Sequence, residues 1–128
     1  MILVDSCVIM DYLAGNSTRA AVQLDKILSE GMAAISPITV SELFSDPKAS
    51  HDVAAFISAL VAAPFKEGYW QRSGELRARV RKLGLKAALG DALIAQTAID
   101  HGWPLLTSDA DFKHYLRAGL KLAMPLSA

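Results

Sequence analysis

The chain has 128 residues, with 13 basic and 13 acidic side chains and a hydrophobic fraction of 52%. This length predicts one domain over residues 1–128, large enough to bury a hydrophobic core. Cys7 is the only cysteine, which excludes an internal disulfide and a zinc site built from several cysteines of one chain. The start of the chain lacks a basic segment, and the most apolar window, residues 54–65, is too short to cross a membrane. We therefore expect a cytoplasmic protein without a membrane segment.

Hydrophobic spacing and turn residues predict strands that alternate with helices. In chain order the expected elements are a strand over 1–4, helices over 6–14 and 18–30, a strand over 32–36, helices over 36–44, 52–62, 69–83 and 91–102, a strand over 104–107, a helix from 108, and a strand over 120–124. Thr39 and Glu42 have the spacing of a capping box, and the helix over 52–62 is expected to be largely buried. The alternation indicates an α/β fold, with a parallel β-sheet and helices on both faces.

Four carboxylates occupy positions at which such a sheet would open a binding site. Asp5 ends the first strand, and Asp109 follows the third. Glu42 lies in the first turn of the helix after the second strand, and Asp91 begins a helix. Ligands of open parallel sheets bind beyond the carboxyl ends of the strands, and carboxylates gathered there repel one another unless a cation holds them. The four acids therefore predict a site for Mg²⁺, with Mn²⁺ as a substitute.

Each of these acids also has a purely structural explanation. Glu42 would complete the capping box, Asp5 would cap the helix that follows it, and the other two would favour the dipoles of their helices. Asp111, three residues after Ser108, would complete a similar box, and we assign it a supporting role. Helix capping does not explain why all four acids fall near the carboxyl ends of parallel strands, so the joint pattern favours the metal site.

The charges of the chain are unevenly distributed. Residues 66–86 carry seven bases and two acids, whereas the rest of the chain carries six bases and eleven acids. A basic segment beside an acidic pocket suits a polyanion whose phosphates bind one part and meet metal at the other. The candidates for phosphate contact are Arg72, Arg77, Arg79, Arg81 and Lys82. Arginines that are simply solvated and an acidic partner segment docked on this helix are the alternatives. The inner face of the helix is expected to hold Trp70, Leu76, Val80 and Leu83.

Four sequence blocks, in order and at family-like spacing, carry a resemblance over essentially the whole chain. They are ILVDS at 2–6, SPITVSEL at 36–43, GDALIA at 90–95 and LTSDADF at 106–112. With these blocks the chain resembles a PIN domain, and in particular the small VapC-type toxin nucleases of bacterial toxin–antitoxin pairs. The PIN-like fold is an α/β/α sandwich.

The resemblance implies a Mg²⁺-dependent endoribonuclease that cleaves RNA phosphodiester bonds with a metal-activated water and is restrained by a cognate antitoxin. It places the metal ligands and catalytic residues at Asp5, Glu42, Asp91 and Asp109. The residues expected to orient these carboxylates or their waters are Ser6, Thr107, Ser108 and Asp111. Cys7 stands where many relatives have Ser or Asn, which puts in doubt any hydrogen bond from that position.

Other functions stay open beside the toxin nuclease. A PIN nuclease of RNA maturation or decay would share the fold and the acids. A phosphatase of the haloacid-dehalogenase type would need a second Asp where Cys7 stands, and a metal-free ribonuclease would need two placed imidazoles. A catalytically silent interaction module would have no need of the four acids. The apolar excess over the usual ~45–50% suggests a homodimer, with residues 53–60 as the candidate surface.

Overall fold

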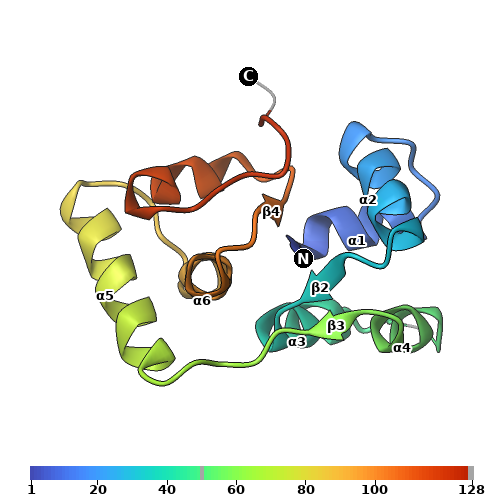
Figure 1. Ribbon diagram of the computed structural model, residues 1–128, viewed down its shortest axis with the longest axis horizontal. Coiled ribbons are helices and arrows are strands. Elements are labelled where there is room, and N and C mark those ends of the chain that lie inside the picture. Colours follow the sequence, from blue (N-terminus) through green and yellow to red (C-terminus); the bar gives the residue numbers. More distant parts are fainter. Residues whose placement is uncertain (50, 127–128) are drawn as a thin grey trace.

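The computed structural model of the protein describes residues 1–49 and 51–126 (Figure 1). The strands within this part are β1 (Ile2–Val4), β2 (Ala33–Ile35), β3 (Val61–Ala62) and β4 (Leu105–Leu106). The helices are α1 (Ser6–Leu13), α2 (Arg19–Ser29), α3 (Pro37–Phe44), α4 (His51–Ser58), α5 (Tyr69–Lys82), α6 (Leu89–His101) and the 3₁₀ helix η1 (Ala110–Ala118). No helix in the described part is long and apolar enough to span a membrane.

The four strands form one parallel sheet in the order β3-β2-β1-β4. Leu3 of β1 pairs with Ala34 of β2 on one side and with Leu105 of β4 on the other. Because β1 lies between β2 and β4, the segments that follow these three strands meet at the same edge of the sheet. The predicted α/β fold with a parallel sheet is confirmed.

Alternate residues of the strands face two separate hydrophobic cores. Leu3 packs into a core with α5, α6 and η1, while the next residue, Val4, packs into a core with α1 and α2. Figure 1 shows α1 and α2 on one side of the strands and α5, α6 and η1 on the other. A parallel sheet covered in this way buries both faces of its strands, which explains their continuous apolar runs.

Two elements differ from the sequence prediction in the region after α3. The predicted helix over 52–62 ends at Ser58, and Val61–Ala62 forms the exposed edge strand β3 instead. Helix α4 holds no fully buried residue, so the prediction of a largely buried helix is wrong. A short apolar run fits a strand and a helix equally well, and here the run continues across a turn into the sheet.

The last predicted strand is reduced to a single bridge. Among residues 120–124, only Leu122 pairs with the sheet, as a parallel bridge to Leu105. Leu105 donates to Lys121 and accepts from Ala123, each over 2.8 Å. This segment therefore covers the outer edge of β4 without becoming a regular strand.

The inner faces of α3 and α5 also differ in detail from the prediction. Ser36, not Thr39, caps α3, because its hydroxyl accepts from the amide of Ile38 over 3.1 Å. The predicted capping box with Glu42 is therefore absent. Tyr69 and Ser73 take the inner positions of α5 beside Leu76 and Val80. Two residues predicted to face inward, Trp70 and Leu83, are each 60% exposed.

Candidate metal centre

Strand–helix junctions bring Asp5 and Asp109 to one edge of the sheet, and helices α3 and α6 bring Glu42 and Asp91 there. Asp5 directly follows β1 and caps α1, with its Oδ1 accepting from the amide of Ser6 over 2.8 Å. Asp109 comes three residues after the end of β4 and caps η1. Glu42 lies on α3, the helix that follows β2, and Asp91 lies in the first turn of α6.

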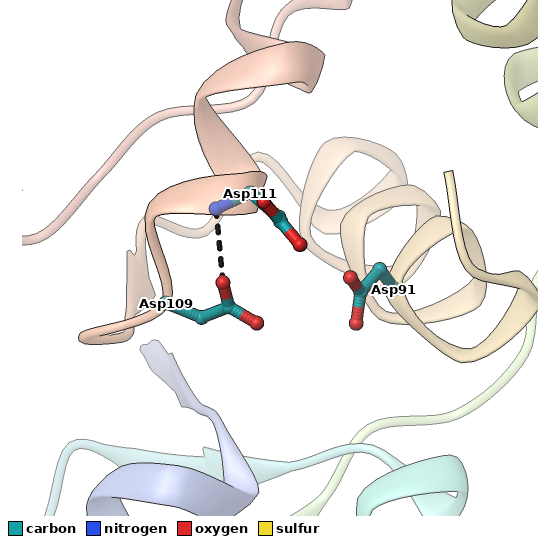
Figure 2. Close-up of side chains that lie close together, drawn as sticks. All are labelled: Asp91, Asp109 and Asp111. Atoms are coloured by element: carbon teal, nitrogen blue, oxygen red, sulfur yellow. Dashed lines mark hydrogen bonds between the residues drawn. The ribbon is translucent and has the colours of Figure 1, made fainter. Parts of the chain in front are cut away.

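Three carboxylates form a cluster with the spacing of a metal site. Asp91, Asp109 and Asp111 each offer an oxygen atom, and these atoms lie within 4.8 Å of one another. Figure 2 shows Asp91 from α6 facing Asp109 and Asp111 from the start of η1. Asp109 accepts from the amide of Asp111 over 2.9 Å, which makes Asp109 the cap of η1 and leaves the Asp111 carboxylate free of the expected capping box with Ser108.

Asp5 is the buried member of the site, with 5% of its surface exposed. Its Oδ2 accepts from the Thr107 hydroxyl over 2.7 Å and from the Cys7 thiol over 3.1 Å. Burial raises the pKa of Asp5, although these hydrogen bonds and the one from the Ser6 amide oppose the change. Thr107 also accepts from the amide of Asp109 over 3.0 Å, so one hydroxyl ties β4 to both acids.

Cys7 supplies a hydrogen bond from the position at which the sequence put one in doubt. Besides donating to Asp5, its sulfur accepts from the Ser108 hydroxyl over 3.3 Å. Burial, followed by the charge of Asp5, raises the pKa of the Cys7 thiol. The group therefore stays a neutral donor and does not compete with the carboxylates for a cation.

Glu42 completes the quartet of predicted acids from the side of α3. Burial raises its pKa, and the charges of Asp5 and Asp91 raise it further, while a hydrogen bond from Ser6 lowers it. A Cβ placed on Gly90 would lie 3.5 Å from the Glu42 Oε2, so this carboxylate packs beside the residue that precedes Asp91. The four acids therefore share one electrostatic environment.

Asp91 carries the clearest sign of crowded negative charge. Burial and then the charges of Asp109, Asp5 and Asp111 raise its pKa to about 6, against a weaker opposing effect of Lys86. A carboxyl group shifted in this way is held beside like charges that a cation would neutralise. Because every atom of the cluster that could bind a metal is a carboxylate oxygen, the residues fit a hard divalent ion such as Mg²⁺ or Mn²⁺.

Two residues that lie beside the site could not be identified from the sequence. The Lys86 ammonium is 3.5 Å from the Asp111 carboxylate. The charges of Asp91, Asp111 and Asp109 all act on the buried hydroxyl of Tyr115. Lys86 appeared in the sequence only as part of the basic segment, and Tyr115 had the spacing of an ordinary core residue, so neither carried a local signal.

The predicted phosphate-binding residues divide into engaged and exposed groups. Arg72 pairs with Asp100 over 2.5 Å and also donates to the Glu67 carbonyl. Arg77 donates to the carbonyl of Ala87 over 2.8 Å, which ties α5 to the segment before α6. The side chains that remain exposed are those of Arg79, Arg81 and Lys82. Arg79 lines a groove between α5 and η1 together with Leu76, Val80, Leu83, His114, Arg117 and Ala118.

Known proteins share this sequence pattern and this arrangement of elements. A sequence model described as "PIN domain" matches residues 2–117. The chain is similar to one in VapBC2 from Rickettsia felis, crystallised with a DNA fragment from its promoter, at 25% identity and a TM-score of 0.74, covering 95% of this chain and 97% of that chain. FitAcB from Neisseria gonorrhoeae gives 24% identity and a TM-score of 0.69, with coverages of 95% and 96%. DNA-bound VapBC from Salmonella typhimurium gives 22% identity and a TM-score of 0.70, with coverages of 94% and 95%. None of the curated proteins matches the chain.

Proposed function

The chain belongs to the PIN domain family, and from this premise we propose that it is a metal-dependent endoribonuclease acting as the toxin of a toxin–antitoxin pair. The observation that carries the proposal is the convergence of Asp91, Asp109 and Asp111 at the edge of the sheet where Asp5 and Glu42 also lie. Charge repulsion of this kind is costly unless the site has a cationic ligand. RNA is the polyanion that the resemblance implies.

The acids would hold the ion, and their neighbours would fix the acids. A bound Mg²⁺ would supply an activated water and neutralise charge on the scissile phosphate. We assign ligand roles to the predicted quartet and add Asp111, because its oxygen lies within the same 4.8 Å cluster. Thr107 holds Asp5 and the backbone of Asp109 in place, and Cys7 restricts the Asp5 carboxylate from the other side. Hydrogen bonds of this kind orient ligands and tune their affinity for the metal.

The exposed bases of α5 would contact RNA phosphates outside the acidic cluster. Arg79, Arg81 and Lys82 are the candidates, whereas Arg72 is engaged by Asp100. Replacing Arg79 with Ala should weaken RNA binding and reduce the slope of log affinity against log salt by about one. Replacing Arg117, which lines the same groove from η1, tests whether the groove as a whole follows the RNA.

Partners are proposed from the similar structures. Those structures are VapBC and FitAcB assemblies; one VapBC assembly holds a promoter DNA fragment, and another is bound to DNA. We therefore propose that a cognate antitoxin binds this chain and blocks its site. The proposed homodimer also stays a prediction. Within residues 53–60, its candidate surface, the larger apolar side chains are half-buried against the core around α1 and α2, whereas the alanines at 54, 55 and 59 are exposed. An interface there would use these alanines and the outer edges of the larger side chains.

Cleavage assays test the enzymatic part of the proposal. The purified protein should cut single-stranded RNA only with added Mg²⁺ or Mn²⁺, and the Asp5→Asn variant should lose that activity. Asp11→Asn, on the same helix and outside the acidic cluster, is the matched control. Undiminished cleavage in chelator would refute the metal mechanism.

Expression in a bacterial host separates a toxin from a nuclease of RNA maturation or decay. A toxin should arrest growth, and co-expression of its partner should restore it. Active protein that leaves growth unaffected would instead support the maturation or decay nuclease. Failure to bind Mn²⁺ at all would favour a silent interaction module.

A further inference from the structure

Tyr115 on η1 is a fully buried residue whose polar end has no hydrogen-bond partner. None of its surface is exposed, and its hydroxyl oxygen and that of Thr39 are the two buried side-chain polar atoms without a partner among the described residues. A buried hydroxyl in this state loses the hydrogen bonds that water would give it. Native proteins seldom retain such a group unless it serves another purpose.

The surroundings of this hydroxyl connect it to the acidic cluster. Tyr115 lies on the helix that begins after Asp109 and contains Asp111, and it belongs to the same buried core as Ala92, the residue that follows Asp91. Among charged groups Asp91 affects it most, followed by Arg77, Asp111 and Asp109. Burial and then the charge of Asp91 raise the pKa of Tyr115 to about 12. A tyrosine hydroxyl carries its proton at neutral pH and can act as a hydrogen-bond donor.

We propose that the Tyr115 hydroxyl is a positioning group that would donate a hydrogen bond to the Asp91 carboxylate when a divalent cation is bound. The inference rests on the proposed metal site and names a residue that tunes it. Asp91 accepts no side-chain hydrogen bond from residues 1–49 or 51–126, whereas Asp109 accepts from the Asp111 amide and Asp111 pairs with Lys86. A neutral donor behind the carboxylate would orient it without competing for the cation.

This role differs from that of a hydroxyl that merely holds the fold together. A structural hydroxyl contributes in the metal-free protein, and its removal lowers stability there. The Tyr115 hydroxyl has no partner in that state, so its removal should be harmless without metal and costly only when metal binds. The two roles therefore predict opposite patterns for the same substitution.

The Tyr115→Phe variant removes one oxygen and leaves the packed ring in place. Its melting temperature in chelator should equal or exceed that of the wild type, because a bare buried hydroxyl is lost. Its affinity for Mn²⁺, measured by calorimetric titration without RNA, should fall about tenfold, the smaller end of the effect seen for groups that orient metal ligands.

Tyr69→Phe is the matched control. Tyr69 is equally buried, but its hydroxyl donates to the Leu93 carbonyl over 2.6 Å and accepts from Thr97 over 3.1 Å. This variant should melt at a lower temperature in chelator and keep its Mn²⁺ affinity within about twofold of the wild type. Tyr115→Phe should therefore change the Mn²⁺ affinity but not lower the melting temperature, and Tyr69→Phe should do the opposite.

The same titration distinguishes failure of this inference from failure of the proposed function. If the wild type does not bind Mn²⁺, the metal site itself is refuted. If the wild type binds and Tyr115→Phe binds equally well, only the positioning role is refuted. A Tyr115→Phe variant that loses stability in chelator would assign the hydroxyl a structural bond and would refute the role as well.

Discussion

The Asp5 carboxylate accepts hydrogen bonds from three neighbours, whereas the Asp91 carboxylate accepts none from the side chains that the structure describes. Asp5 directly follows the central strand, so the fold itself supplies its donors. Asp91 faces Asp109 and Asp111 instead, and burial followed by their charges raises its pKa. One side of the site is thus held by hydrogen bonds within the protein, and the other side holds crowded negative charges that the proposed cation would neutralise. Variants on the two sides should respond differently to metal removal.

Asp91→Asn should give the largest effect, because it acts on the side that depends on the cation. RNA cleavage in Mg²⁺ should fall by more than about 100-fold, beyond the range seen for groups that only orient ligands. The melting temperature in chelator should rise at neutral pH, since one of several repelling charges is gone. An Asp91→Asn protein that cleaves normally would contradict the role of Asp91 as a metal ligand. One that melts at a lower temperature in chelator would contradict the charge repulsion around it.

Thr107→Val tests the side that the protein organises. The substitution keeps the shape of the side chain but removes the donor to Asp5 and the acceptor for the Asp109 amide. The free energy of unfolding in chelator should fall by about 1–3 kcal/mol, because these buried groups lose their partner. Denaturant titration measures this change.

Thr97→Val is the control for that experiment. Thr97 is also buried and hydrogen-bonded, to Leu93 and Tyr69, and no acid of the site contacts it through those bonds. Both variants should be destabilised, but only Thr107→Val should also bind Mn²⁺ more weakly. Equal Mn²⁺ affinities in the two variants would show that Thr107 serves the fold alone.

The pH dependence of stability should show the effect of the crowded charges around Asp91. The pKa of Asp91 is raised from 3.8 to about 6, so the folded protein binds more protons than the unfolded chain between these values. The contribution of Asp91 to stability should therefore decrease as pH rises from about 4 to 6 in chelator. The difference in melting temperature between wild type and Asp91→Asn should grow over this window. Metal binding should strengthen over the same window, because protons compete with the cation.

The places of Asp5 and Asp109 in the fold could be predicted because each follows the end of a strand, whereas Glu42 lies beyond the first turn of α3, the turn in which it was predicted. Asp5 after an apolar run and Asp109 after β4 could be placed at one sheet edge from the parallel topology alone. The contacts that distinguish the two sides could not be predicted in the same way. The hydrogen bond from Thr107 to Asp5 joins residues 102 positions apart, and it depends on the register of β1 with β4. The burial of Tyr115 depends on how η1 packs.

Local errors in the sequence analysis have a similar cause. Residues 61–62 fall within the predicted helix because a short, continuous apolar run shows neither the spacing of a helix nor that of a strand. Pairing with β2 makes them a strand. Trp70 was expected inside α5, but Tyr69 takes the inner position because its hydroxyl reaches the Leu93 carbonyl of α6. In both cases a contact between distant segments decided between two locally acceptable structures.

Lys86→Ala, outside the acidic cluster, should give the smallest effect. The Lys86 ammonium lies 3.5 Å from Asp111 and lowers the pKa of Asp91, so it partly neutralises the side that awaits a cation. The pair is largely exposed, and loss of an exposed ion pair changes stability by about 0–1 kcal/mol. Removal of the Lys86 side chain should nevertheless strengthen Mn²⁺ binding by a few-fold at low ionic strength, because a competing positive charge is gone, and this gain should shrink in added salt.

The control is Lys82→Ala, on the exposed end of α5, which should leave Mn²⁺ affinity unchanged. Weaker Mn²⁺ binding in Lys86→Ala would mean that the ammonium holds the carboxylates of Asp91, Asp109 and Asp111 together. The protein would then organise this side of the site as it organises the side of Asp5.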